Sequence, residues 1–144
     1  MAKRTVMAFG SFDILHPGHV HYLERAASLG DRLIVIVARD SNIAILKKRP
    51  PAFKERDRLH LISSLKFVDK AVLGNRNRTR EDFYRIILKY KPKIIALGYD
   101  QKVNVRELSS WLDSRNLHSR IVRIRSSLNP RSYKSSIIRG HIAG

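Results

Sequence analysis

The sequence predicts an α/β fold, a doubly wound parallel sheet of five strands with helices on both faces. Short apolar runs alternate along the chain with longer amphipathic runs, the order expected of strands joined by helical crossovers. The run Arg32–Ala38 is apolar at nearly every position, as in a strand covered on both faces. A glycine follows the first apolar run and a proline opens the next segment, which is typical of a strand-to-helix turn.

The first half of the chain supplies two strands and two helices. Thr5–Phe9 is apolar and runs into a glycine, so we expect the first strand there. Val20–Ser28 is expected to be a helix because its apolar residues recur on one face. Arg32–Ala38 is the second strand, and Asn42–Leu46 is expected to be a short helix.

The second half repeats this alternation. A loop with two adjacent prolines, Lys47–Phe53, leads to a helix at Lys54–Ser64, because apolar residues there recur in helical phase. The remaining elements are a strand at Lys70–Leu73, a helix at Glu81–Tyr90, a strand at Lys93–Leu97, a helix at Val105–Arg115, a strand at Arg120–Ile124 and a short terminal helix at Ser135–Ile142. No linker divides the chain, so residues 1–144 form a single Rossmann-like domain.

Composition narrows the class of protein. With 144 residues, 43% of them hydrophobic, the chain is long enough for one core. No apolar run approaches the length of about 20 residues that spans a bilayer, and the N-terminus does not read as a signal peptide. There is no cysteine, which excludes disulfides, thiolate catalysis and thiolate metal sites. We expect a cytoplasmic protein that does not bind membranes.

The chain is strongly basic. Lys and Arg number 29 against 12 Asp and Glu, for a net charge of +17, which favours anionic partners such as nucleic acid or phosphorylated small molecules. A basic nucleic-acid-binding module is therefore one alternative. It is disfavoured because the 11 aromatics, counted as 5 Phe, 1 Trp and 5 Tyr, fall mostly at core-like positions rather than between basic residues.

The most informative segment lies between the first strand and the first helix. Gly10 lets the backbone turn sharply, and Ser11 offers a hydroxyl and a backbone donor. His16 and His19 flank Pro17-Gly18, and proline suits the first turn of a helix. The two imidazoles are therefore expected at a helix N-terminus beyond a parallel strand, where phosphate is commonly bound.

Two further segments are expected to reach the same edge of the sheet, because ligands of doubly wound sheets bind beyond the carboxyl ends of the strands. Asp100 follows a buried strand, and its carboxylate suits a ribose or a base. Ser135 and Ser136 suit a helix start that caps itself or binds phosphate, with Lys134 and Arg139 supplying positive charge. The basic cluster at Lys47–Arg49 is either exposed surface or a loop that closes over a triphosphate.

These residues resemble the HIGH-motif nucleotidylyltransferase superfamily, in its small cytidylyltransferase-like branch. The stretch from Gly10 to His19 matches the pattern Gly-Thr/Ser-Phe-Asp-x-x-His-x-Gly-His. Tyr133–Arg139 resembles the C-terminal Ile-Ser-Ser-Ser/Thr-x-x-Arg motif, although Tyr133-Lys134 replaces the usual residues before the serines. Within the branch the sequence is most similar to archaeal FAD synthases, as the ending Arg39-Asp40 and the turn Gly98–Gln101 indicate.

The resemblance implies an FMN adenylyltransferase, which transfers the AMP moiety of ATP to FMN and gives FAD and diphosphate by in-line attack on the α-phosphorus. Mg²⁺ or another divalent cation is expected to arrive with ATP, so no protein metal site is predicted. Relatives in this superfamily are often dimers, so a homodimer stays open. The implied catalytic residues are His16, His19, Lys134 and Ser135, and the implied nucleotide contacts are Gly10, Ser11, Phe12, His16, Pro17, Gly18, His19, Asp100, Ser135 and Ser136.

Other acceptors stay open at this point. Transfer of CMP from CTP to glycerol 3-phosphate would use the same chemistry with different pockets, and phosphopantetheine is a further acceptor. A class I aminoacyl-tRNA synthetase shares a similar histidine motif, but 144 residues leave no room for its tRNA-binding parts.

Overall fold

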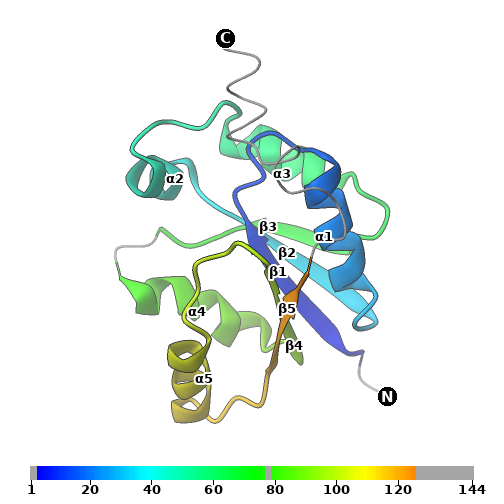
Figure 1. Cartoon of the computed structure of the whole chain (residues 1–144), viewed down its shortest axis with the longest axis vertical. Helices are drawn as coiled ribbons and strands as arrows, with labels where there is room; N and C mark the ends of the chain where they lie inside the picture. The colour runs from blue at the N-terminus through cyan, green and yellow to red at the C-terminus, as the bar shows by residue number, and fades with distance from the viewer. Residues whose placement is uncertain (1–2, 77–78, 126–144) are drawn as a thin grey trace.

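The computed structural model describes residues 3–76 and 79–125, and it contains a five-stranded sheet in the order β3-β2-β1-β4-β5 (Figure 1). All neighbouring strands run parallel, which confirms the predicted doubly wound α/β architecture. The strands are β1 (Thr5–Gly10), β2 (Arg32–Val37), β3 (Lys70–Leu73), β4 (Ile94–Gly98) and β5 (Arg120–Ile124).

Five helices connect the strands in the described residues. The first begins at Pro17 rather than at the predicted Val20, because His16 caps the helix and the fixed φ of proline suits its first position. The predicted terminal helix, Ser135–Ile142, lies outside the described residues. None of the described helices is both long and apolar enough to cross a membrane. The helices are α1 (Pro17–Ala27), α2 (Asp40–Lys47), α3 (Glu55–Ser63), α4 (Arg80–Tyr90) and α5 (Val105–Ser114).

The sheet lies between two helical layers. Side chains of β1 alternate between them, because successive residues of a strand point to opposite faces. Val6 and Ala8 pack in the core shared with α1 and α3, whereas Met7 and Phe9 pack in the core shared with α4 and α5 (Figure 1). All four side chains are buried, which explains why the central strands read as continuous apolar runs.

The order of the strands reverses next to β1. From β1 the chain passes through α1 to β2 on one side, and from β3 it returns through α4 to β4 on the other side. Ala8 of β1 therefore pairs with Val35 of β2 and with Ala96 of β4. The connections leave β1 and β4 in opposite directions at this carboxyl edge, which is where doubly wound sheets bind ligands in a crevice, and α2 lies beyond the edge (Figure 1).

Candidate functional site

Two polar side chains close the gap where the carboxyl ends of β1 and β4 separate. Gln101 donates from Nε2 to the Phe9 carbonyl oxygen at 2.6 Å and accepts from the Gly98 N–H at 2.9 Å. Tyr22 of α1 donates to the Ala96 carbonyl oxygen at 2.7 Å and accepts from the Phe9 N–H at 3.3 Å. Burial raises the pKa of the Tyr22 hydroxyl, so it remains a protonated donor. Together these side chains hold β1, β4 and α1 in register at the crevice.

The turn from β1 to α1 depends on Gly10. Phe12 has a φ of 50°, a left-handed conformation that folds its ring back beside Gly10. A Cβ atom on Gly10 would lie 2.5 Å from the nearest atom of that ring. The ring is 3% exposed and meets the His19 ring edge-on, with the centroids 5.4 Å apart. The resemblance implies a nucleotide contact at Phe12, but its side chain supports His19 from the core, and a contact through its backbone stays a prediction.

The two histidines of the motif bind the backbone at the start of α1. His16 is the N-cap residue, and its Nδ1 accepts from the Gly18 N–H at 3.1 Å. His19 lies one turn on, and its Nδ1 accepts from the His16 N–H at 3.3 Å. The rings stack with their centroids 3.7 Å apart. Because each Nδ1 is an acceptor, a neutral ring carries its proton on Nε2, and Nε2–H is the donor that each histidine has for a ligand.

Both imidazoles are neutral near pH 7. The pKa of His19 is lowered to about 3, mainly by burial and in addition by the charge that His16 carries when protonated and by the charge of Lys47. Burial also lowers the pKa of His16, although the nearby carboxylate of Asp100 acts in the opposite direction. The site therefore offers hydrogen-bond donors without placing two positive charges side by side.

Charged groups of both signs border the histidines. Asp100 follows β4, as predicted, and its carboxylate interacts electrostatically with His16 and Lys47. Partial burial lowers the pKa of Lys47 at the end of α2, and the neighbouring Arg49 and Arg58 lower it further. Lys47, the first residue of the basic cluster, therefore lies near the site rather than on unrelated surface. This position favours the alternative in which the cluster acts on a triphosphate.

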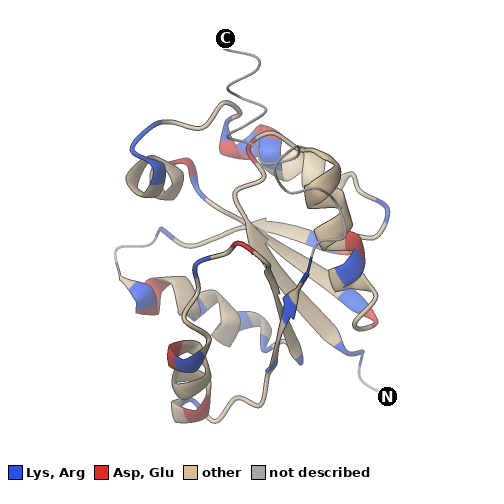
Figure 2. Ribbon diagram, viewed as in Figure 1, with Lys and Arg blue, Asp and Glu red and all other residues tan. Residues whose placement is uncertain are grey.

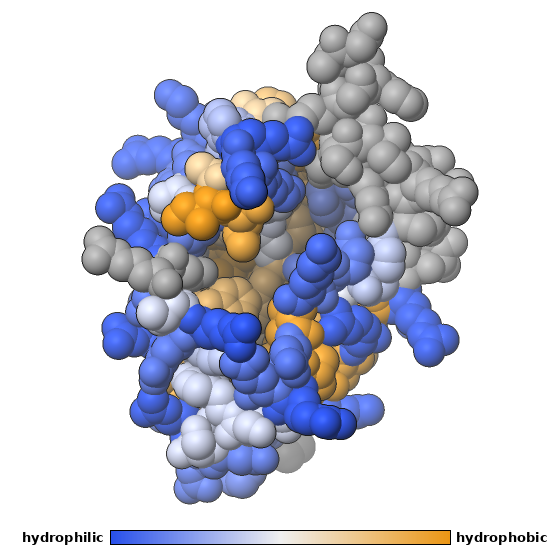
Figure 3. Space-filling view, turned by 60° about the vertical axis from the view of Figure 1, so that its left-hand side comes forward, coloured by the Kyte–Doolittle hydropathy of each residue, from blue (hydrophilic) through white to orange (hydrophobic). Residues whose placement is uncertain are grey.

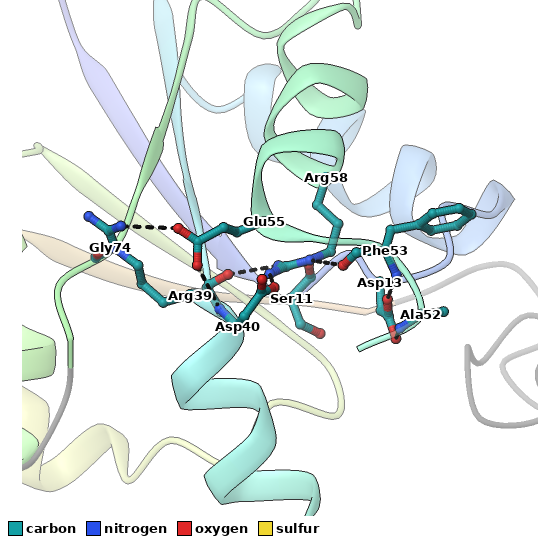
Figure 4. A network of polar contacts seen from close by, with 10 residues as sticks. Ser11, Asp13, Arg39, Asp40, Ala52, Phe53, Glu55, Arg58 and Gly74 are labelled. Atoms are coloured by element: carbon teal, nitrogen blue, oxygen red, sulfur yellow. Dashed lines mark hydrogen bonds and ion pairs between the residues drawn. The ribbon is translucent and has the colours of Figure 1, made fainter. Parts of the chain in front are cut away.

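A buried arginine ties three loops at this edge together (Figure 4). Arg58 of α3 is 0% exposed. Its guanidinium ion-pairs with Asp40 at 2.6 Å, at the start of α2. It also donates to the carbonyl oxygens of Ser11 at 2.8 Å, Ala38 at 2.7 Å and Phe53 at 2.9 Å. The loop after β1 and the loop after β2 are thus fixed relative to α3.

Asp13 anchors another part of the same edge. Its carboxylate is 2% exposed and accepts from the backbone N–H groups of Ala52 and Phe53, each at 3.0 Å. The carboxylate thus reaches across to the proline-containing loop and holds that loop against the site.

The carboxyl edge is hollowed. Figure 3 shows a hollow with an apolar floor, ringed by hydrophilic side chains. Exposed apolar side chains also occur at this edge, on α2 and in the loops before α3 and after β4: Ile45, Leu46, Phe53 and Tyr99. A ligand with a flat apolar ring and charged phosphates suits such a surface.

The remaining site predictions divide into two groups. Ser11, Pro17 and Gly18 lie at the turn into α1, beside the histidines, and their contacts with a nucleotide stay predictions. Lys134, Ser135 and Ser136 lie outside the described residues. Within residues 3–76 and 79–125, no group of three or more His, Asp or Glu side chains could hold a metal ion.

A family model described as cytidylyltransferase-like matches residues 7–141. The chain belongs to the cytidylyltransferase-like family. The histidines at the carboxyl edge and the sheet that carries them both lie within the matched residues.

Three curated relatives of this cytidylyltransferase-like protein are named FAD synthase. It is 47% identical over 121 residues to the FAD synthase of Archaeoglobus profundus, a match that covers 84% of this chain and 74% of that protein. It is 45% identical over 137 residues to the FAD synthase of Thermoplasma acidophilum, covering 95% and 92% of the two chains. The FAD synthase of Thermoplasma volcanium is 49% identical over 119 residues, covering 83% of this chain and 80% of the relative.

Solved structures share the fold of this family member. A protein of Thermoplasma volcanium described as a lipopolysaccharide core biosynthesis protein superposes with a TM-score of 0.79 at 45% identity, covering 89% of this chain and all of that one. A pantoate-beta-alanine ligase of Francisella tularensis superposes with a TM-score of 0.63 at 14% identity, covering 95% of this chain and 68% of that one, which shows a shared fold only.

Sequence reasoning missed the residues that support the site of this cytidylyltransferase-like protein. Arg58 lies in helical phase with the apolar Ile62 and Leu65, and a charge on an apolar face is a signal that could have revealed it. Tyr22 lies three residues after His19, on the same face of α1. Gln101 has no such signal, because its hydrogen bond to β1 joins residues that are 92 positions apart in the sequence.

Proposed function

We propose that this chain is an FAD synthase, which transfers the AMP moiety of ATP to FMN and releases diphosphate. The observation that carries the proposal is the pair of neutral histidines, His16 and His19, which hold Nε2–H donors at the N-terminus of α1 on the carboxyl edge of the sheet. The family and the relatives named FAD synthase, at 45–49% identity, support the choice of reaction.

The reaction is a displacement at phosphorus. An oxygen of the FMN phosphate forms a bond to the α-phosphorus of ATP, and the bond from that phosphorus to the bridging oxygen breaks. Diphosphate leaves with the electron pair, and no protein nucleophile is needed. The protein contributes by positioning the reactants and stabilising the charge on the phosphoryl oxygens.

In the proposed reaction, the charged and polar groups at the edge bind different parts of the nucleotide. His16 and His19 donate to oxygens of the α-phosphate, and the N–H groups and dipole of α1 add to this stabilisation. Lys47 provides a positive charge on the opposite side of the crevice from Asp100, which accepts hydrogen bonds from the nucleoside. Lys134, Ser135 and Ser136 are proposed to bind the β- and γ-phosphates.

A divalent cation such as Mg²⁺ would enter the site with the nucleotide. The described residues contain no group of three or more ligating side chains, which suits an ion held mainly by phosphate oxygens and water. When bound, the cation neutralises part of the charge on the phosphates. The protein's own residues orient the phosphates and bury them away from water.

A matrix of nucleotides and acceptors tests the proposal. The purified protein is incubated with Mg²⁺ and either ATP or CTP, together with FMN, glycerol 3-phosphate or phosphopantetheine, and diphosphate release is measured. We expect diphosphate and FAD from ATP with FMN. CDP-glycerol from CTP would instead assign the cytidylyl transfer that the family description suggests, and no diphosphate from any pair would remove the proposed chemistry altogether.

A further inference from the structure

The first turn of α2 is firmly anchored at the carboxyl edge. Arg39, its N-cap residue, donates from Nε to the Gly74 carbonyl oxygen at 2.9 Å. Asn42 donates from Nδ2 to the Asn75 carbonyl oxygen at 2.8 Å. Gly74 and Asn75 directly follow β3, so the start of α2 is bound above the ends of β2 and β3.

The last turn of α2 extends beyond this anchor with the same face turned toward the crevice. Residues three and four apart in a helix share a face. Leu46 and Lys47 therefore lie on the face that carries Asn42 and Ile43, and both of the earlier residues are buried. Leu46 is nevertheless 81% exposed, and Lys47 is close enough to His19 for their charges to interact. An inward-facing leucine thus overhangs open space at the edge of the site.

We propose that Leu46 forms an apolar wall of the acceptor pocket and packs against the ring system of FMN. The inference rests on the proposed function. FMN joins a flat apolar ring to a phosphate, and α2 presents the matching pair, an apolar side chain at Leu46 and a positive charge at Lys47. Figure 3 shows apolar surface at the rim of the hollow, next to hydrophilic side chains.

The layout of the crevice assigns this wall to the acceptor rather than to ATP. Asp100 follows β4, on one side of β1, and accepts hydrogen bonds from the nucleoside in the proposed reaction. The end of α2 lies on the other side, above β2 and β3. In-line displacement brings the acceptor oxygen to the α-phosphorus opposite the leaving diphosphate. With the nucleoside on the β4 side, the surface under α2 on the β2 side is left for the acceptor ring.

A matched pair of leucine and isoleucine variants tests the inference. Ile45 is also exposed, at 69%, but it lies on the opposite side of α2 from the buried Ile43, whereas Leu46 projects between Asn42 and Ile43. FMN binding is measured by titrating the flavin fluorescence against wild-type protein, Leu46→Ser, Ile45→Ser and Leu46→Met. ATP binding is measured in parallel by calorimetry, and thermal unfolding confirms that each variant folds.

We expect Leu46→Ser to raise the Kd for FMN about fivefold to tenfold, as the loss of part of a leucine contact implies. Ile45→Ser and Leu46→Met should change it less than about twofold, because one lies outside the wall and the other conserves volume. The Kd for ATP should not change. Equal FMN affinities for the two serine variants, or a loss confined to ATP, would overturn the inference and leave the proposed function standing. Wild-type protein that binds no FMN would overturn both.

Discussion

His16 and His19 combine two roles in one pair of side chains. Their Nδ1 atoms accept from the backbone N–H groups of Gly18 and His16, which have no partner within the helix. With Nδ1 accepting, a neutral ring carries its proton on Nε2 and can donate from that atom. An alanine at either position therefore removes a helix cap together with a ligand contact, and variants must separate the two effects.

Cap-preserving variants separate them. Asparagine caps helices well at the N-cap position, and glutamine at the third helical position completes the capping box. We expect His16→Asn and His19→Gln each to lower kcat by about 10²–10³ with an unchanged Tm, because one donor to the phosphoryl oxygens is lost. His16→Ala should lose about 1 kcal/mol of stability in addition. His118→Ala, an exposed histidine before β5, serves as the control and should change neither quantity. Turnover near the wild-type rate in both cap-preserving variants would contradict the assigned roles.

The lowered pKa of His19 predicts how stability depends on pH. In the unfolded chain the pKa has its usual value of 6.5, and in the folded protein it is about 3. Between these values the unfolded state binds more protons, so the free energy of unfolding falls as the pH falls through this window. His19→Gln lacks this titration. Urea unfolding at about pH 7.5 and about pH 5 should therefore show a larger loss for wild type than for His19→Gln. Equal losses would mean that His19 is protonated as easily in the folded state as in the unfolded one.

At the scale of elements, Arg58 determines how the loops after β1 and β2 meet. Its guanidinium bonds to Ser11, Ala38, Phe53 and Asp40, and a planar group with several donors suits these divergent acceptors. The contribution of α3 to the site is therefore indirect, since it holds the segment that precedes the histidines rather than touching the ligand.

Substitution of Arg58 should destabilise the protein and distort the site. We expect Arg58→Lys to lower the free energy of unfolding by about 3 kcal/mol, because a single ammonium cannot satisfy four acceptors in a buried position. Arg56→Ala on the exposed side of the same helix is the control, with a change within about 0.5 kcal/mol. Urea unfolding measures both variants. A similar small change in the two would show that the network contributes little.

Helices and strands that are marked by a local pattern of apolar residues were predictable from the sequence. The strands follow from continuous apolar runs, and β2 was predicted within one residue of its observed end. The start of α1 was placed at Val20 instead of Pro17, because the apolar periodicity begins later than the cap. The resemblance implies a nucleotide contact at Phe12, but no periodicity reveals that its ring is buried beside Gly10, because this depends on a left-handed backbone conformation.

At the scale of the whole molecule, most of the positive charge belongs to residues outside the groups proposed to bind the substrates. Lys and Arg are spread over loops, strands and helices on both faces of the sheet (Figure 2). A net charge of +17 raises the local concentration of anions such as ATP and FMN and speeds their encounter. The bound state depends on the few groups at the carboxyl edge, which are partly shielded from salt.

The salt concentration should therefore affect the binding of substrates more than the rate of the chemical step. We expect kcat/KM for ATP and FMN to fall severalfold between about 0.05 M and about 0.5 M KCl, because screening weakens long-range attraction. The value of kcat should change less than about twofold. Steady-state kinetics at several salt concentrations, with sodium glutamate as a second salt, measure both. A kcat that falls as steeply as kcat/KM would show that surface charge acts on the chemical step.

The position of the site was predictable from the sequence, whereas its supports were not. Parallel strands and the histidine motif placed His16, His19 and Asp100 at one edge, because the fold dictates where strand ends converge. The bonds of Asp13 and Gln101 join segments far apart in the chain, so only the folded structure brings their partners together.

The mutual capping of the two imidazoles has a consequence for how activity arises during folding. Each ring is oriented by a backbone N–H group at the first turn of α1, so neither ring has a defined direction when this turn is unfolded. The ability to bind phosphate therefore forms when this first helical turn forms. Local fraying of the turn would remove the orientation of both rings before the sheet unfolds.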